Sequence, residues 1–336
     1  MQTVKRKRSP LLLMSLSLAG LFIIAVITPI VPTTAASLDA NLVLEVVWKA
    51  DTSAHPIAGG CNIAVDGVGH LYVTDYGVDG HSYQIHKFDS SGSYVMSWGS
   101  TGSGPGEFSW RPDTPDGGPD AGFLATDQAG NVYVSDGYNF RVQKFNGEGE
   151  FLLEWGTMGE ADGQFLPPSV GPASIDSQGN VYVPDFAHVQ IFDGSGHFLD
   201  QFGSFGSNEG EFQGASQVGW DSQGNLYIAD LLNGRYQKFD AEGTLLQVVS
   251  AAGDGALLMP FQVVVDSQDH VFVTDNSERL QLFDTEGHFI TSWTEPGNGD
   301  GPFELVSAVA VDREDNLYIA FFRQDGGCAP YKVRLN

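Results

Sequence analysis

The chain has 336 residues, of which 42 are acidic and 16 basic, and its formal net charge is −26 at pH 7. All 42 acidic residues but only 12 of the basic ones follow position 36, so residues 37–336 carry a formal charge of −30. A surface this acidic repels phosphate backbones, whose binding requires clustered lysine and arginine, and we therefore expect no nucleic-acid partner.

The first 36 residues have the features of a targeting segment. A basic cluster at Lys5–Arg8 precedes an apolar run over 11–30, and small residues follow at 34–36. This order predicts a secretory signal peptide that is cleaved after Ala36. The run also reaches the roughly 20 residues that span a bilayer, so an uncleaved membrane anchor is the alternative. In both cases we expect residues 37–336 to be secreted or extracytoplasmic, with membrane contact only through this segment.

Residues 37–336 contain an internal repeat, which predicts a single domain. One pattern recurs: an apolar strand that ends in Asp, a turn, and a second strand of the form Tyr-Val-x-Asp. A third strand ending in Phe follows, and then a fourth that ends in Trp-Gly or Phe-Gly. The first-strand aspartates are Asp66, Asp127, Asp176, Asp221, Asp266 and Asp312, with spacings of 61, 49, 45, 45 and 46 residues. A period near 45 residues with four short strands is typical of a propeller blade.

The two ends of this domain are complementary, because one lacks a strand and the other has an additional one. The sixth copy stops at its third strand, over 331–335, while the segment 41–48 precedes the first copy and resembles a fourth strand. We therefore expect the N-terminal strand to complete the last blade, which closes the ring and leaves only short, protected edges. The predicted fold is all-β, a six-bladed β-propeller of four-stranded antiparallel blades.

The blade pattern resembles the NHL repeat. The resemblance rests on the Asp-terminated second strand and on the glycine-rich connectors Trp98–Phe108, Trp155–Phe165 and Phe202–Phe212, and it extends from residue 41 to the C-terminus. It implies the propeller fold. It implies no single activity, because one architecture carries many functions.

The only two cysteines are predicted to form a disulfide. Cys61 starts the first strand of blade 1, and Cys328 lies in the loop between the second and third strands of blade 6. In a closed ring these blades are neighbours and both positions lie on one face. An exported compartment permits oxidation.

Blade 2 resembles the corresponding blade of peptidyl-hydroxyglycine amidating lyases. The stretch 136–145, followed by Glu154-Trp-Gly156, carries this resemblance, which implies a catalytic role for Tyr138. That family holds zinc with histidines at the start of first strands. None stands at the matching positions here, which are Cys61, Gly122, Gly171, Ser216, Phe261 and Ser307. We therefore expect no metal site and no cofactor, with calcium as the open alternative.

A second series of aspartates ends the second strands, at Asp75, Asp136, Asp185, Asp230 and Asp275, and Phe321 breaks it in the last copy. A residue that is repeated in nearly every blade favours a structural role, and we expect these carboxylates to cap backbone groups of a neighbouring loop. The residues that follow them are predicted to surround the mouth of the central channel. They are Tyr76, Gly137, Phe186, Leu231, Asn276 and, in blade 6, Phe322.

The sequence favours a non-catalytic binding or scaffold module for a protein, peptide or glycan. Long connectors enter the same face over 109–120 and 323–330, and irregular insertions on a rigid scaffold are where binding function tends to lie. The predicted binding residues are Tyr76, Trp110, Arg111, Tyr138, Phe186 and Phe322. A metal-dependent enzyme of the amidating-lyase or lactonase type and a structural envelope domain are the alternatives.

Overall fold

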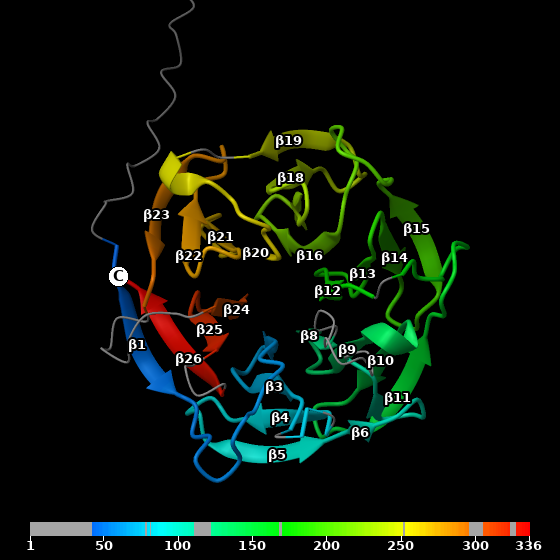
Figure 1. Ribbon diagram of the computed structural model, residues 1–336, viewed down its shortest axis with the longest axis vertical. Coiled ribbons are helices and arrows are strands. Elements are labelled where there is room, and N and C mark those ends of the chain that lie inside the picture. The colour runs from blue at the N-terminus through cyan, green and yellow to red at the C-terminus, as the bar shows by residue number, and fades with distance from the viewer. Residues whose placement is uncertain are drawn as a thin grey trace, which may run out of the picture. The chain divides into compact units, whose positions relative to one another are not determined.

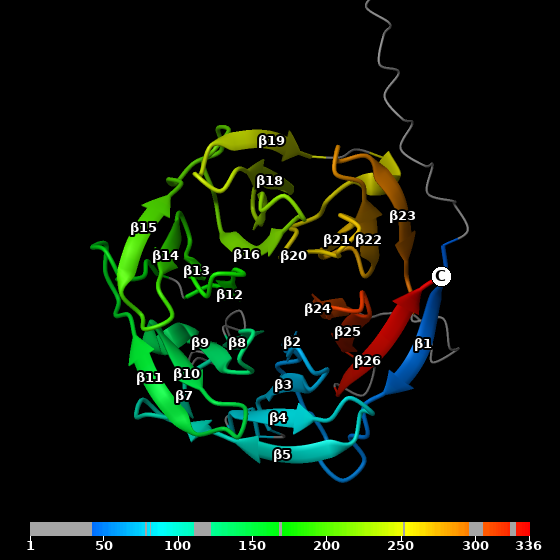
Figure 2. The same ribbon diagram turned by 180° about the vertical axis from the view of Figure 1, so that it is seen from behind.

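The structure, a computed structural model, describes residues 42–77, 79–80, 82–110, 122–167, 170–250, 253–295, 305–322 and 327–336. Its strands form six four-stranded antiparallel sheets, which stand around a common axis as the blades of a propeller (Figures 1 and 2). The predicted all-β, six-bladed fold is thus confirmed. The predicted signal peptide or anchor lies outside the described residues, and none of the helical segments within them could cross a bilayer.

In each of the first three blades the first strand lies nearest the axis and the fourth at the circumference (Figure 1). A short parallel pair, β6 (Ser100–Thr101) and β7 (Glu107–Phe108), lies in the connector between blades 1 and 2. The blade strands are β2 (Ile63–Val65), β3 (Leu71–Asp75), β4 (Gln84–Phe88) and β5 (Tyr94–Trp98); β8 (Gly122–Thr126), β9 (Val132–Asp136), β10 (Arg141–Phe145) and β11 (Phe151–Trp155); and β12 (Ser174–Ile175), β13 (Val181–Pro184), β14 (Val189–Phe192) and β15 (Phe198–Phe202).

The last three blades repeat this order, except that β1 supplies the fourth strand of blade 6. Two single-turn 3-10 helices, η1 (Gly137–Asn139) and η2 (Gly253–Gly255), lie in loops. The blade strands are β16 (Ala215–Trp220), β17 (Leu226–Asp230), β18 (Arg235–Phe239) and β19 (Leu245–Val249); β20 (Gln262–Val265), β21 (Val271–Thr274), β22 (Leu280–Phe283) and β23 (Phe289–Trp293); and β24 (Leu305–Val311), β25 (Leu317–Phe322), β26 (Cys328–Leu335) and β1 (Leu44–Lys49).

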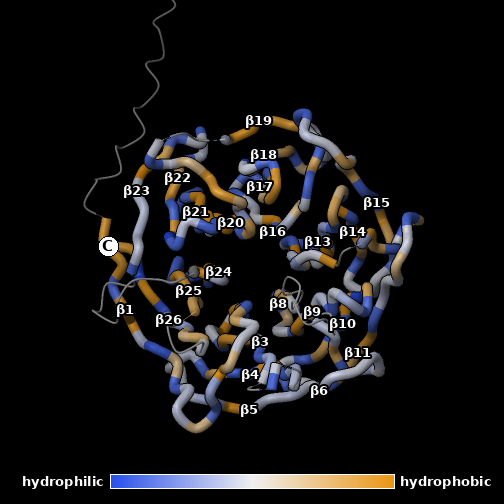
Figure 3. Tube along the Cα trace, in the orientation of Figure 1, coloured by the Kyte–Doolittle hydropathy of each residue, from blue (hydrophilic) through white to orange (hydrophobic). Residues whose placement is uncertain are grey.

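The hydrophobic core lies between the blades. Strands β3 and β9 are buried at all five positions, because both faces of a middle strand are covered. One core cluster joins Tyr72 and Ile85 of blade 1 to Leu124 and Phe145 of blade 2. Strands such as β16 and β19 are apolar along much of their length, and hydrophilic residues gather at the turns (Figure 3). Removal of this apolar surface from water is the main favourable contribution to folding.

In blades 1 and 2, a tryptophan at the end of the fourth strand packs against a glycine of the next blade. A Cβ added to Gly149, in the last turn of blade 2, would lie 2.9 Å from the indole of Trp98 in blade 1. Gly196 of blade 3 has the same relation to Trp155, at 2.8 Å. Both glycines have positive φ, 77° and 82°, which glycine adopts readily because it has no Cβ. The turn and the contact between blades therefore require the same residue.

The first-strand aspartates organise the turns at the opposite end of the strands. The carboxylate of Asp127 accepts hydrogen bonds from the backbone and side chain of Asn131 at 2.9 and 2.8 Å and from the Tyr133 hydroxyl at 3.1 Å. The Lys144 ammonium lies 3.6 Å from this carboxylate and 4.8 Å from the centre of the Tyr133 ring. Burial alone would raise the pKa of Asp127, but the hydrogen bonds and the Lys144 charge together lower it.

The ring closes as predicted. Strand β1 pairs antiparallel with β26, with Leu44 opposite Leu335, so the first described strand lies beside the last (Figure 1). The indole N–H of Trp293 donates to the Leu42 carbonyl at 3.1 Å, which ties blade 5 to the same strand. The predicted disulfide is confirmed, with 5.5 Å between the Cα atoms of Cys61 and Cys328.

Candidate functional site at the channel mouth

An apolar cavity of about 430 Å³ lies at the end of the ring where the blade connectors enter. All six blades contribute to it, either from the start of the first strand or from the end of the second, which places it on the propeller axis. Its lining consists of Gly60, Asn62, Phe123, Gly171, Pro172, Asp185, Phe186, Gly214, Ala215, Ser216, Leu231, Met259, Phe261, Asn276, Ser307 and Phe322. The volume is that of a site for a small molecule or a few side chains.

The second-strand aspartates hold the connectors that surround this cavity. Each accepts a backbone N–H from the connector that leads into its own blade, and the pairs are Ala58 N to Asp75 at 2.8 Å, Ser109 N to Asp136 at 2.7 Å, Leu166 N to Asp185 at 3.3 Å, Gln213 N to Asp230 at 2.9 Å and Leu258 N to Asp275 at 2.8 Å. The predicted capping role is confirmed. Among the described residues, no three His, Cys, Asp or Glu side chains gather as metal ligands would.

In two blades the same aspartate also pairs with a buried arginine. Arg235 Nε donates to Asp230 Oδ2 at 2.7 Å, while its terminal nitrogens donate to the carbonyls of Asn208 and Glu211 at 2.7 and 2.9 Å. Arg141 and Asp136 repeat this arrangement in blade 2, with 2.8 Å between Nε and Oδ2. The guanidinium therefore fixes the connector from its carbonyl side and the carboxylate fixes it from its N–H side.

The structure separates the predicted binding residues into two groups. Phe186 and Phe322 line the cavity. Tyr76 and Trp110 are 3% and 0% exposed, because both pack in the core cluster between blades 1 and 2, where their ring centres lie 6.2 Å apart. In this structure the side chains of Tyr76 and Trp110 therefore support the connector from within and do not reach the surface.

The remaining predicted residues do not join the cavity. Tyr138 lies in η1, where its N–H donates to the Ser109 carbonyl at 3.0 Å, and it is absent from the lining. Arg111 lies outside the described residues. Of the six positions predicted to surround the mouth, Leu231 and Asn276 also line the cavity, whereas Gly137 is buried at the start of η1.

Sequence reasoning missed three large apolar side chains of the lining, Phe123, Met259 and Phe261. A signal for Phe261 was present, since it stands five residues before Asp266, at the position where four of the six blades contribute to the lining. Met259 has φ of 53°, in the left-handed region that non-glycine residues seldom adopt. No residue pattern marks that conformation, because it is set by the connector around it.

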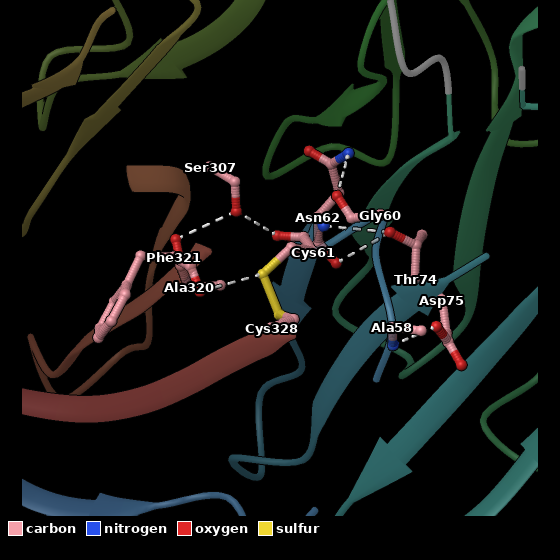
Figure 4. The surroundings of a disulfide bond; sticks show 10 residues. All are labelled: Ala58, Gly60, Cys61, Asn62, Thr74, Asp75, Ser307, Ala320, Phe321 and Cys328. Atoms are coloured by element: carbon pink, nitrogen blue, oxygen red, sulfur yellow. Dashed lines mark hydrogen bonds between the residues drawn. A yellow bond between two sulfur atoms is a disulfide. The ribbon is translucent and has the colours of Figure 1, made fainter. Parts of the chain in front are cut away.

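Residues that line the cavity flank one half of the disulfide, whose surroundings Figure 4 shows. Cys61 is fully buried between Gly60 and Asn62, which both line the cavity, and its carbonyl accepts a hydrogen bond from the Ser307 hydroxyl of blade 6 at 2.9 Å. The bridge thus joins the two blades at the ring seam, next to lining residues of the cavity. Disulfides of this kind are typical of proteins from oxidising compartments.

A sequence comparison supports the repeat assignment. The profile of the NHL repeat matches residues 120–145, which span β8 to β10 of blade 2. This chain is a six-bladed β-propeller with an NHL repeat. No curated protein sequence matches this chain.

Solved structures resemble the NHL propeller in fold. A protein of unknown function from Bacteroides thetaiotaomicron matches with a TM-score of 0.61 at 14% identity, over 87% of this chain and 76% of that one. A streptogramin B lyase matches with a TM-score of 0.55 at 12% identity, over 88% of this chain and 98% of that one. A catalytically inactive virginiamycin B lyase from Staphylococcus aureus, solved with quinupristin, matches with a TM-score of 0.54 at 11% identity, over 86% of this chain and 88% of that one. At these identities the likeness concerns the fold alone.

Proposed function

We propose that the NHL propeller is an exported, non-catalytic binding module that holds an apolar part of a protein or peptide ligand at the channel mouth. The single observation that carries this proposal is the cavity of about 430 Å³ to which all six blades contribute and whose large side chains are apolar. The predicted signal or anchor segment and the disulfide support export.

Exposed apolar side chains stand near the lining. Phe186, which lines the cavity, stacks on Phe205 with 5.7 Å between ring centres, and Phe205 is 61% exposed. Leu232 and Leu258, next in sequence to the lining residues Leu231 and Met259, are also more than half exposed. Exposed apolar side chains beside an apolar concavity are typical of an interaction site.

Two strained backbone positions lie at the same place. Of the six non-glycine residues with positive φ among the described residues, Met259 at 53° lies in the lining and Cys61 at 55° lies beside it. Such conformations cost of order 1–3 kcal/mol each and persist where the surroundings impose them, which favours a functional role for the segments concerned.

Binding of the neutral apolar dye N-phenyl-1-naphthylamine tests the proposal. We expect one saturable site per chain, and the variants Phe186→Ala and Leu231→Ala to weaken binding by about tenfold each, because each removes a large apolar contact. Phe151→Ala on β11 and Leu199→Ala on β15 are matched controls, since both residues are exposed on outer strands away from the cavity. Binding that is absent, or that the controls weaken as much as the cavity variants do, would exclude the cavity as the site.

A further inference from the structure

We infer that the ligand of this cavity is an amphiphilic cation, with an apolar body that enters the cavity and a positively charged group at the mouth. The inference rests on the proposed function and specifies the chemistry of its ligand. It follows from what the cavity contains, from where the protein places its own cations, and from the overall charge.

The only ionisable side chain in the cavity lining of the described residues is Asp185. It is 2% exposed, and its carboxylate accepts N–H groups of Ala187 and His188 at 3.0 and 2.8 Å besides that of Leu166. The ring of His188 lies 3.4 Å from this carboxylate but does not line the cavity. The lining therefore offers an anionic ligand no positive partner, and a charge buried without a partner is costly.

Five cations of the described residues bind elsewhere. Lys144, Lys238 and Lys332 lie at the opposite end of the strands, each over a tyrosine ring at 4.8–5.2 Å and beside a first-strand aspartate. Arg141 and Arg235 point into their own blades, where aspartates and connector carbonyls bind them. None of these groups faces the cavity.

No basic side chain of the described residues lines the cavity, so the charge of the whole domain acts on it. Residues 37–336 carry 42 acidic and 12 basic side chains, and a cleft with low-dielectric walls concentrates the resulting negative potential. The phenylalanines of the lining favour a cation as well, since the face of an aromatic ring is negative.

Two ions of the same shape and opposite charge can show how much of the binding is due to charge and how much to apolar contact. Tetraphenylphosphonium and tetraphenylborate present the same four phenyl rings, and their binding to the full domain can be measured by calorimetry at low and at high salt. We expect one tetraphenylphosphonium per chain, bound at least about tenfold more tightly than tetraphenylborate, with the preference reduced in about 1 M salt. Phe186→Ala should weaken the cation's binding and Phe151→Ala should leave it unchanged.

Each possible outcome decides a different point. Equal binding of both ions, or a preference for the borate, would overturn the inference and leave the cavity as a site for neutral apolar groups. A cation preference that Phe186→Ala leaves untouched would also overturn it, because binding would then be general adsorption to an acidic surface. If neither ion binds and the neutral dye does not bind either, the proposed function itself fails.

Discussion

The turn position four residues after each first-strand aspartate is occupied by Asn in four blades and by His in two, His70 and His270. In both histidines the ring nitrogen Nδ1 replaces the Asn amide, at 2.8 Å from Asp66 and 2.7 Å from Asp266. The substitution preserves the hydrogen bond but makes it depend on pH, because imidazole titrates and an amide does not.

His270 provides a test of this pH dependence. The hydrogen bond that the His270 ring donates to the Asp266 carboxylate raises the pKa of His270 above its usual value of 6.5, against the opposing effect of burial. A raised pKa in the folded state gives stability that is present below pH 6.5 and is lost as the pH rises through the folded-state pKa. We therefore expect His270→Asn to lower the free energy of unfolding by about 1 kcal/mol more near pH 5.5 than near pH 9.

Chemical denaturation at the two pH values measures this difference. His197→Asn is the control, because His197 makes the same turn contact with Asp193 while its side chain is 79% exposed, and exposed pairs contribute little. An equal effect of His270→Asn at both pH values would mean that the charged form of His270 gains nothing from Asp266.

Between neighbouring elements, the second-strand aspartates join strands to connectors. Asp230 is fully buried and binds the backbone of its connector, the amide of Gln237 and the guanidinium of Arg235 at once. Blade 6 lacks this aspartate, and there Phe321 stacks on Tyr331 with 5.3 Å between ring centres and an interplanar angle of 10°. Tyr331 holds the strand position of Gln237, so an aromatic contact replaces a polar one within the same architecture.

Removal of this carboxylate should destabilise the domain strongly. We expect Asp230→Ala to lower the free energy of unfolding by roughly 3–5 kcal/mol, because it leaves the buried Arg235 charge unpaired. Urea denaturation of both proteins measures the change, with Asp200→Ala on the exposed face of β15 as the control, expected within about 0.5 kcal/mol of the unchanged protein. A loss below about 1 kcal/mol for Asp230→Ala would show that the connector does not depend on this anchor.

At the scale of the whole molecule, the ring is closed twice. Strand β1 completes blade 6 by backbone pairing with β26, and the disulfide joins blade 6 to blade 1 across 267 residues of sequence. Because the pairing closes the ring at the circumference and the bridge closes it beside the axis, the two devices constrain different parts of the seam.

Loss of the disulfide should therefore lower the free energy of unfolding but should not abolish the fold. We expect the double variant Cys61→Ser, Cys328→Ser to be less stable by up to about 5 kcal/mol, since the bridge restricts a very long loop of the unfolded chain. Thermal or urea unfolding measures this, and a reductant should destabilise the unchanged protein while leaving the variant unaffected. The dye should also bind the variant more weakly, because Cys61 lies between the lining residues Gly60 and Asn62. Identical stability of the two proteins would mean that β1 pairing alone holds the seam.

The sequence by itself determined the features that repeat. The aspartate turns occur in all six copies and the Asp-terminated second strands in five, so the copies of each signal reinforce one another, and the missing fourth strand of the sixth copy stands out against them. From these, ring closure follows, and with it the approach of Cys61 and Cys328.

Only the tertiary structure decided which side chains face the ligand cavity. Tyr76 and Phe186 follow equivalent aspartates, yet Tyr76 is buried against Trp110 whereas Phe186 lines the cavity. Met259 reaches the lining through a left-handed backbone conformation that its sequence does not specify. The physical reason is that a loop side chain turns toward whichever neighbour buries it best, and that neighbour belongs to another blade, tens of residues away along the chain.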